Sequence, residues 1–399
     1  MSNDVTVRVP TGRRRLMWLV MVLLVIAALC SAAVYWRLNA RPALPDGLSP
    51  EEYAVAAAVV SGTTGQTPDH FDALMVAAEQ ADGRGDLETA VAAFSGVPDQ
   101  HLRHGAVARL REGELLVRLN QAIRAEDRFR RFLKLAENNL KVSARDISVA
   151  EKWLSFLLSV ELRLDERRLI LQAAHRAGRI DLADSKQYFF PRLLIWKSST
   201  GRTRLNDFLE TDPHSLILNV ADGRYLTGEG RLSEARELLA ALRHQFPNDL
   251  NCAVAFLECC FEQNDWASVT QTLQTMPPYR LHEPHVITWI RGEAALHDEH
   301  WEDAVRHFEA ALQSDASNPA VHMGLAKALG KLGQTQQQQV VRDRSLLLSR
   351  IRVEMARVRD TAPDEVRTLA DRCRQLEMDE AATVFQWHAD RLKQKQAPK

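Results

Sequence analysis

A small apolar residue recurs in this sequence at nearly constant intervals, each time in the middle of an amphipathic segment. It falls at Ala235, Val269 and Ala304, with separations of 34 and 35 residues. Upstream, Ala90 and Ala125 are 35 residues apart. Large apolar residues stand three positions before and four positions after most of them, which is helical spacing. Small residues let two helices approach closely, while large ones fill the groove between them. The spacing therefore predicts an all-α array of antiparallel helix pairs.

The composition agrees with an all-α fold and excludes several classes of protein. Glycine (18) and proline (15) are too sparse in 399 residues for a chain of many β-hairpins. With 46% apolar and 26% charged residues the chain can bury a core, which excludes intrinsic disorder. The 51 Lys and Arg balance 52 Asp and Glu, so no nucleic-acid partner is predicted. The five cysteines form no CxxC motif, and buried apolar positions are the better interpretation of them.

Three of the segments resemble the second helix of the tetratricopeptide repeat family. They are GDLETAVAAF (85–94), GRLSEARELL (230–239) and HWEDAVRHFEAAL (300–312). The family period is 34 residues, and the best single match is the unit 216–249. The whole chain resembles the membrane-anchored bacterial members of this family. The resemblance implies a right-handed solenoid of about eight or nine helix pairs with a concave surface that takes a protein or peptide.

The predicted solenoid spans 71–345 and is uneven. The best repeats are 71–104, 106–139, 216–249, 250–283 and 285–318. The units 145–213 and 319–345 are diverged, because Arg167 and Gln338 stand where a small residue is expected, and Phe190-Pro191 should end or kink a helix. Helices in 346–399 are expected to cap the array.

The N-terminus predicts a single membrane anchor. Residues 16–36 carry no charge and are long enough to cross a bilayer as a helix. Four arginines in the tail 1–15 outnumber the two that follow the span, which favours a cytoplasmic tail and an extracytoplasmic solenoid. Residues 37–70 form a tether with a short helix that begins near Pro50. Two alternatives stay open: cleavage near Ser31-Ala32-Ala33, and the inverted topology.

No known catalytic or nucleotide-binding motif occurs, and the sequence predicts no catalytic, cofactor-binding or metal-ligating residue. Histidines are the one unusual group. His282 and His285 are spaced HxxH, as are His297 and His300, and His322 lies nearby. A cryptic metal-dependent activity at the His282–His322 cluster is therefore the alternative to a non-catalytic scaffold.

The resemblance also implies which side chains line the concave groove. Carried over unit by unit from the first helix of each repeat, they are Arg224, Asn251, Glu258, Phe261, Trp289, Glu293 and Lys327. Phe261 and Trp289 can anchor a peptide, or they can serve packing between repeats. Glu258 and Glu293 oppose the carboxylate clamp of chaperone-binding members. The predicted function is a membrane-tethered protein-interaction scaffold without catalysis; a cytoplasm-facing regulator is the topological alternative.

Overall fold

The computed structural model describes residues 44–45, 48–64, 69–137, 141–191, 199–276, 283–355, 357–359 and 361–396. Throughout these residues the regular elements are α-helices, so the all-α prediction is confirmed. None of the helices described is both long and apolar enough to span a bilayer. The predicted membrane helix 16–36 lies outside the described residues.

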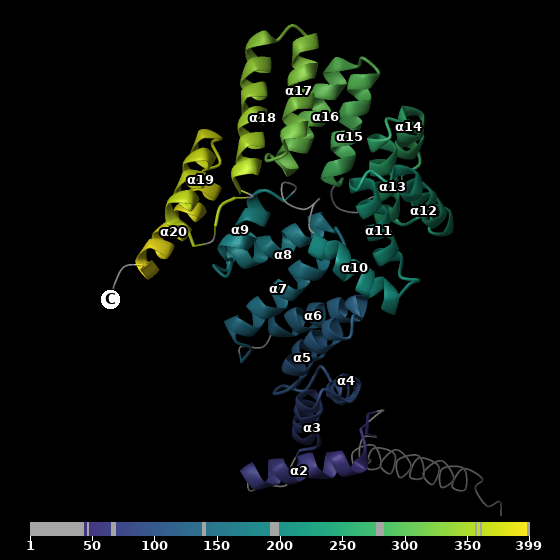
Figure 1. Cartoon of the computed structure of the whole chain (residues 1–399), viewed down its shortest axis with the longest axis vertical. Helices are drawn as coiled ribbons and strands as arrows, with labels where there is room; N and C mark the ends of the chain where they lie inside the picture. Colours follow the sequence, from purple (N-terminus) through teal and green to yellow (C-terminus); the bar gives the residue numbers. More distant parts are fainter. Residues whose placement is uncertain are drawn as a thin grey trace, which may run out of the picture.

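Nearly every helix packs against the helix that follows it in the chain (Figure 1). Their bounds are α2 Pro50–Thr64, α3 His70–Arg84, α4 Leu87–Ser95, α5 Gly105–Arg118, α6 Ala122–Glu137, α7 Ala144–Val160, α8 Leu164–Arg176, α9 Leu182–Phe189, α10 Ser199–Thr211, α11 Leu216–Gly228, α12 Leu232–Gln245, α13 Leu250–Glu262, α14 Trp266–Gln274, α15 His285–His297, α16 Trp301–Ser314, α17 Pro319–Lys331, α18 Thr335–Met355, α19 Pro363–Gln375 and α20 Asp379–Gln396.

The turn between the two helices of a pair has the same conformation along the array. One residue adopts left-handed φ, as at Gly230 (φ 79°), Asn264 (φ 56°) and Glu299 (φ 61°). This residue lies two positions after the end of the first helix, and the second helix begins two residues later. Asp86 and Asp265 then cap α4 and α14 by accepting a hydrogen bond from a backbone N–H. The same turn thus joins the two helices of several successive pairs.

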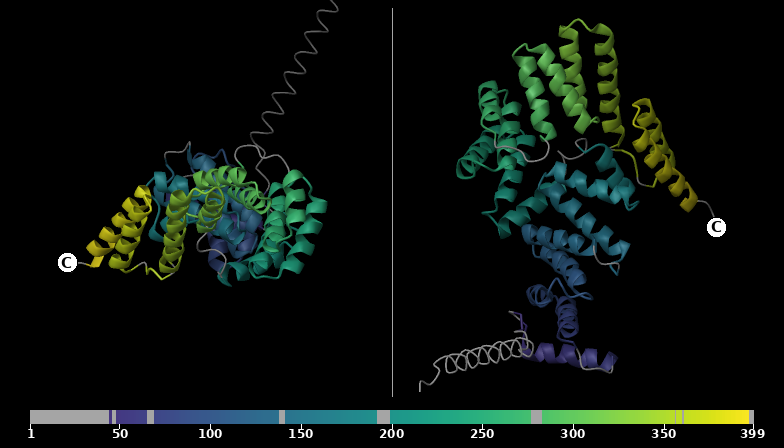
Figure 2. Two further views of the ribbon diagram at one scale, coloured as in Figure 1. Left: turned by 90° about the horizontal axis from the view of Figure 1, so that it is seen from above. Right: turned by 180° about the vertical axis from the view of Figure 1, so that it is seen from behind.

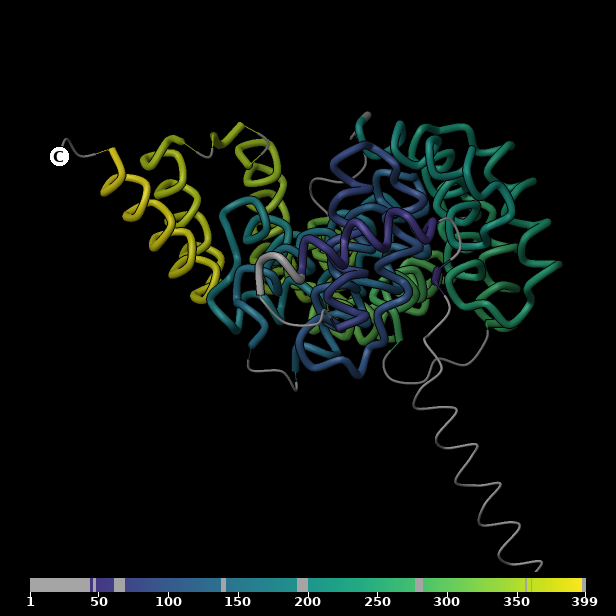
Figure 3. Tube along the Cα trace, turned by 90° about the horizontal axis from the view of Figure 1, so that it is seen from below, coloured from purple at the N-terminus to yellow at the C-terminus, as the bar shows by residue number. Residues whose placement is uncertain are grey.

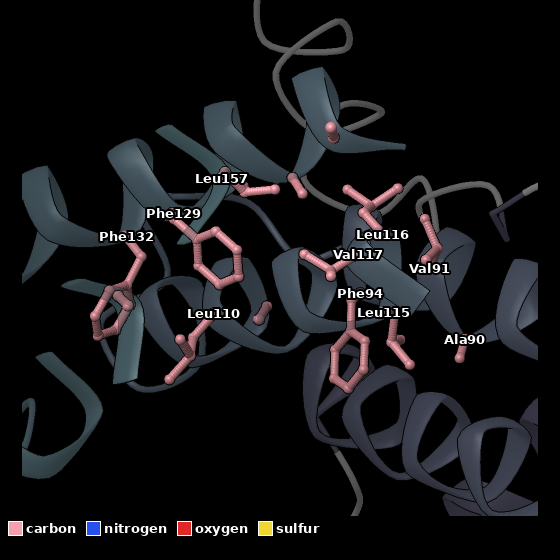
Figure 4. Packing of buried hydrophobic residues seen from close by; sticks show 14 of the residues in the cluster. Ala90, Val91, Phe94, Leu110, Leu115, Leu116, Val117, Phe129, Phe132 and Leu157 are labelled. Atoms are coloured by element: carbon pink, nitrogen blue, oxygen red, sulfur yellow. The ribbon is translucent and has the colours of Figure 1, made fainter. Parts of the chain in front are cut away.

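The small residues that define the sequence period lie where helices meet. Ala90, Ala125 and Ala304 are all fully buried. Figure 4 shows Ala90 and Phe94 in the same apolar cluster as Phe129, which comes from the following pair. The contact within a pair is so close that a Cβ on Gly292 would lie 2.7 Å from the Phe308 ring. The prediction of small residues at close helix crossings is confirmed.

The first diverged unit, residues 145–213 and called the diverged unit below, keeps a helix pair, but Arg167 makes a polar contact where a small residue is expected. Arg167 on α8 donates from Nε to the Oγ of Ser155 on α7, at 3.0 Å. Its Nη1 donates to Gln187 on α9. The helix end expected at Phe190-Pro191 also occurs here, because α9 ends at Phe189, immediately before these two residues.

The array bends back on itself. Helices α11 to α18 form an arch, and α8 and α9 lie on its inner side (Figures 1 and 2). The C-terminal pair α19–α20 returns to α9, where Phe190 packs in one buried cluster with Leu348 of α18 and Phe385 of α20. Figure 3 shows the same return from below. The predicted capping pair therefore closes the arch against the diverged unit.

At the other end, α2 packs on α3. Ala56 and Val60 are buried there, and the Tyr53 hydroxyl lies 2.8 Å from Nδ1 of His70. The predicted start of this helix has a physical basis, because Ser49 and Glu52 cap each other reciprocally. The helix of the predicted tether 37–70 is thus part of the packed array.

Candidate binding groove

The concave side of the arch brings together side chains from the first helix of successive pairs. Arg224 of α11 and Glu258 of α13 form an ion pair there, with Nε 2.9 Å from Oε2. Arg224 is 8% exposed, so this pair neutralises a nearly buried charge. It also links two successive repeats across their interface.

Another segment of the same chain lies over part of this groove. Residues 162–166, at the end of the turn after α7 and the start of α8, line a pocket of about 70 Å³ together with Arg224, Asn251 and Glu258. Further along, Arg168 of α8 donates to the backbone oxygen of Ser314, the last residue of α16. The concave groove is therefore not open along its whole length, because α8 lies against its first half. The reason is the bend of the array, which places the diverged unit inside the arch.

The open part of the groove is a second pocket of about 180 Å³. The predicted residues Glu258, Phe261 and Trp289 line it. The remaining lining residues come from α11, α13, α15, the start of α17 and the end of α18: Thr227, Glu262, Ile290, Asn318, Pro319, Ala320 and Arg352. Its wall is thus formed by α11, α13, α15 and α17, which begin four successive pairs, and by the long helix α18.

Phe261 and Trp289 combine the two roles that the sequence left open. Their rings meet edge to face with centroids 5.3 Å apart, and Phe261 also contacts Trp266 at 5.8 Å. Both belong to the buried cluster between α13 and α15, but both are only partly buried because one side faces the pocket. Each ring therefore joins repeats and presents apolar surface to a ligand.

The last two predicted residues lie beside the pocket rather than on its wall. Glu293 accepts a hydrogen bond from the indole Nε1 of Trp289, at 3.3 Å. Burial raises the pKa of Glu293 above its usual value, while the Trp289 bond and the Lys327 charge act against that rise. Lys327 is exposed. Glu293 thus orients the Trp289 ring, and neither Glu293 nor Lys327 lines the pocket.

A buried charge cluster lies where α7 and α8 meet the groove. Arg163 contacts Glu126 at 2.6 Å, Glu161 at 2.8 Å and Glu166 at 2.7 Å. Burial, with a smaller contribution from Glu126, raises the pKa of Glu161 to about 7. One oxygen of Glu161 has no hydrogen-bond partner within the described chain. This carboxyl therefore changes charge near neutral pH.

The histidines considered as a metal cluster do not converge in the described part of the chain. His282 lies outside the described residues. His285 is buried, and its Nδ1 lies 3.0 Å from the Ala311 oxygen, so Nε2 accepts from Asn318 at 3.1 Å. His322 lies 3.0 Å from the Ala316 oxygen through Nε2. In the described ranges no group of three or more His, Cys, Asp or Glu is placed to hold a metal ion.

Sequence reasoning missed the charged rim of the larger pocket. Glu262 follows Phe261 at the end of α13, and its proximity to a predicted groove position was the available signal. Arg352 had no comparable signal, because the long helix α18 departs from the repeat period before it reaches the pocket.

Comparison with known proteins agrees with this architecture. The sequence model of the tetratricopeptide repeat family matches residues 226–287, which extend from the end of α11 into α15. No curated protein matches the chain significantly in sequence. The described fold is thus an all-helical, tetratricopeptide-like solenoid, as predicted.

Three solved structures resemble the chain distantly. A tetratricopeptide repeat protein from Parabacteroides merdae shares 11% identity with TM-score 0.33, covering 65% of this chain and 98% of its own. The APC/C hetero-tetramer Cut9-Hcn1 gives 13% identity and TM-score 0.37, covering 94% and 86%. Yeast Tom70 gives 12% identity and TM-score 0.32, covering 89% and 67%.

Proposed function

We propose that this protein is a membrane-tethered interaction scaffold that holds a partner protein in the open part of its concave groove. The observation that carries this proposal is the 180 Å³ pocket between α13, α15, α17 and α18. Helical repeat arrays offer extended concave surfaces of this kind for protein binding. The rigid aromatic pair of Phe261 and Trp289 supplies the apolar contact area typical of binding hot spots. The proposal assigns no catalytic step to the chain.

In this proposal the membrane anchor is residues 16–36, and the solenoid lies on the extracytoplasmic side. An uncharged run of bilayer length and the excess of arginine before it support this topology. Anchoring raises the effective concentration of the groove for partners at the same membrane. Alkaline phosphatase and fluorescent protein, each fused after Lys399, test the topology. Active phosphatase is expected, whereas a bright cytoplasmic fluorescent fusion would support the inverted orientation.

Blocking the pocket tests the binding role. Ala320 is an exposed residue at the start of α17 that lines the pocket, so Ala320→Trp fills the space with little cost to folding. Ala316→Trp is the matched control, since Ala316 is exposed nearby but does not line the pocket. Proteins recovered with the full-length chain from membranes are compared for the two variants. Partners lost with Ala320→Trp alone place binding here; identical recovery with both variants argues against it.

A further inference from the structure

The pocket between α13 and α18 has the size of one large side chain. Phe261, Trp289, Ile290, Pro319 and Ala320 give it apolar walls, and its volume is about 180 Å³. A protein cavity of about 150 Å³ is large enough to hold benzene. An aromatic or large aliphatic side chain therefore fits, whereas a folded domain can reach the walls only through such a protruding residue.

Two unpaired charges of opposite sign lie on the lining of this pocket. Glu262 ends α13 and Arg352 stands near the end of α18, and both are exposed. Within the described chain neither side chain has an ion pair or a hydrogen bond. Glu258 differs, because Arg224 already neutralises it at 2.9 Å. An incoming ligand thus meets one uncompensated carboxylate and one uncompensated guanidinium.

The surroundings of Glu262 favour a cation from outside the chain. Desolvation raises the pKa of Glu262 above its usual value, and the neighbouring Glu258 carboxylate adds to this rise. A ligand ammonium or guanidinium group would relieve both effects, because it favours the charged carboxylate. Arg352 offers the opposite preference, since its guanidinium can pair with a carboxylate in a bidentate geometry.

We propose that the pocket binds a peptide segment in which a bulky apolar side chain stands between a basic and an acidic residue. The apolar side chain enters between Phe261 and Pro319, the basic residue pairs with Glu262 and the acidic residue pairs with Arg352. The apolar contact supplies affinity, while the two rim charges select the sequence and its direction. This inference rests on the proposed function and specifies the chemistry of its partner.

Defined peptides test the inference with the full-length protein in detergent micelles. The probe is a fluorescein-labelled heptapeptide with blocked ends in which Lys, Trp and Asp alternate with Gly, made in both orders. Comparison peptides replace Trp by Ala, Lys by Asp, or Asp by Lys. Fluorescence anisotropy should show that one order binds at least about tenfold more tightly than its Ala version, and several-fold more tightly than either like-charged version. Equal binding of all the peptides would overturn the proposal.

Two protein variants assign the charges. Glu262→Gln should abolish the preference for Lys over Asp at that position and keep the preference for Asp at the other position. Arg352→Gln should do the reverse. Arg350→Gln is the matched control, because Arg350 is exposed on the same helix and does not line the pocket. A loss of both preferences in either variant, or the same loss with Arg350→Gln, would contradict the assignment.

The blocking variant Ala320→Trp separates this inference from the proposed function. If the peptides bind equally whatever their charges, and Ala320→Trp abolishes this binding, the charge selection is overturned and the pocket remains a binding site. If no peptide binds but Ala320→Trp still removes partners recovered from membranes, the pocket binds a ligand of another chemical class. That result overturns this inference and leaves the proposed function standing. No peptide binding and no effect of Ala320→Trp on partners overturns both. If the protein dimerises as its concentration rises and Ala320→Trp abolishes this dimerisation, a second copy of the chain occupies the pocket. That result would likewise overturn the inference.

Discussion

His388 on α20 donates from Nε2 to the Oγ of Ser185 on α9, 2.9 Å away, although 203 residues separate the two. The direction follows from the Ser185 hydroxyl, which donates its hydrogen to the Asp181 carbonyl at 2.7 Å. Both side chains are buried. The amino group of Lys186 also lies 3.1 Å from the Val358 oxygen. These contacts, with the apolar cluster around Phe385, hold the C-terminal pair against the diverged unit.

Phe385→Ala should weaken this closure. Phe385 is fully buried and contacts Phe189 and Phe190, with ring centroids 5.8 and 6.5 Å away. Removing it leaves a cavity, so we expect a loss of about 3–5 kcal/mol in the unfolding free energy of this region. Hydrogen exchange of the full-length protein should show faster exchange in α9, α19 and α20.

The matched control is Trp387→Ala, two residues away on the same helix. Trp387 is 49% exposed and contacts Arg391 through a cation–π interaction. Its removal should cost less than about 1 kcal/mol and leave exchange in α9 unchanged. Equal effects of the two substitutions would contradict a buried closure at Phe385.

Glu112→Gln should destabilise the first repeats strongly. Glu112 is fully buried and contacts the Arg109 and Arg128 guanidinium groups at 2.5 and 2.7 Å. Neutralising it leaves Arg109 with Asp99 at 3.2 Å and Arg128 with Asp127 at 2.5 Å, and both of these carboxylates are more exposed than Glu112. We expect a loss of about 1.5–3 kcal/mol, measured by urea unfolding.

Glu114→Gln provides a control with the same sequence spacing. Glu114 pairs with Arg111 three residues earlier at 2.7 Å, but the Arg111 side chain is more than half exposed. Such a surface pair contributes about 0–1 kcal/mol. If Glu112→Gln were as mild as Glu114→Gln, the buried ion pairs would not support the repeat.

Gly292→Ala should destabilise the repeat 285–318. The added Cβ would lie 2.7 Å from the ring of Phe308, which is fully buried and cannot move aside freely. We expect a loss of about 1–3 kcal/mol from overpacking, seen as a lower melting temperature. Gly83→Ala is the control, because nothing lies within 4 Å of its added Cβ in α3. That variant should lose no stability, and an equal loss in both would contradict close packing at Gly292.

The stability of the α7–α8 region should fall as the pH rises through neutrality. Burial holds the pKa of Glu161 at about 7, above its value in an unfolded chain. The native state therefore binds more protons than the unfolded state between about pH 4.5 and 7, and stability decreases across that window. Glu161→Gln should remove this decrease, so the variant gains relative to the natural chain as pH rises from 5 to 8. A gain on the order of 1–3 kcal/mol is expected in urea unfolding.

Glu166→Gln should show the opposite pH dependence. Although burial acts against it, hydrogen bonds and charge from Arg163 and Arg130 lower the pKa of Glu166. The charged Glu166 therefore stabilises the folded state above the pKa that it has in the unfolded chain. This stabilisation is lost as the pH falls through the lower pKa of the folded state. The variant should lose stability at pH 7 and approach the natural chain in acid. Parallel pH profiles for the two variants would refute this assignment.

Much of the repeat architecture could be predicted because its determinants are local. The crossing at Ala304 brings together helices α15 and α16, which are consecutive in the chain, and the side chains that fill the groove stand at fixed helical spacing around it. The predicted groove residues Glu258, Phe261 and Trp289 also line one pocket, because they occupy equivalent positions on stacked helices. Local spacing carries this information.

The rim of the pocket could not be predicted in the same way. Arg352 reaches it through a 21-residue helix that no longer follows the repeat period, and Pro319 and Ala320 reach it through the stacking angle of α17 on α15. Neither the sign of the rim charges nor their lack of partners follows from sequence spacing. Side-chain pairing depends on which helices meet in space.

The sequence alone determined the helix pairs, their small-residue crossings and the side of each first helix that faces the groove. Each depends on residues within about one repeat, so the amphipathic pattern records it directly. Only the tertiary structure decided that α8 and α9 lie inside the arch, that Ser185 meets His388, and that part of the groove is filled by the chain itself. Small rotations between successive repeats add up along a solenoid. Their sum brings distant segments together, and no periodic pattern encodes that sum.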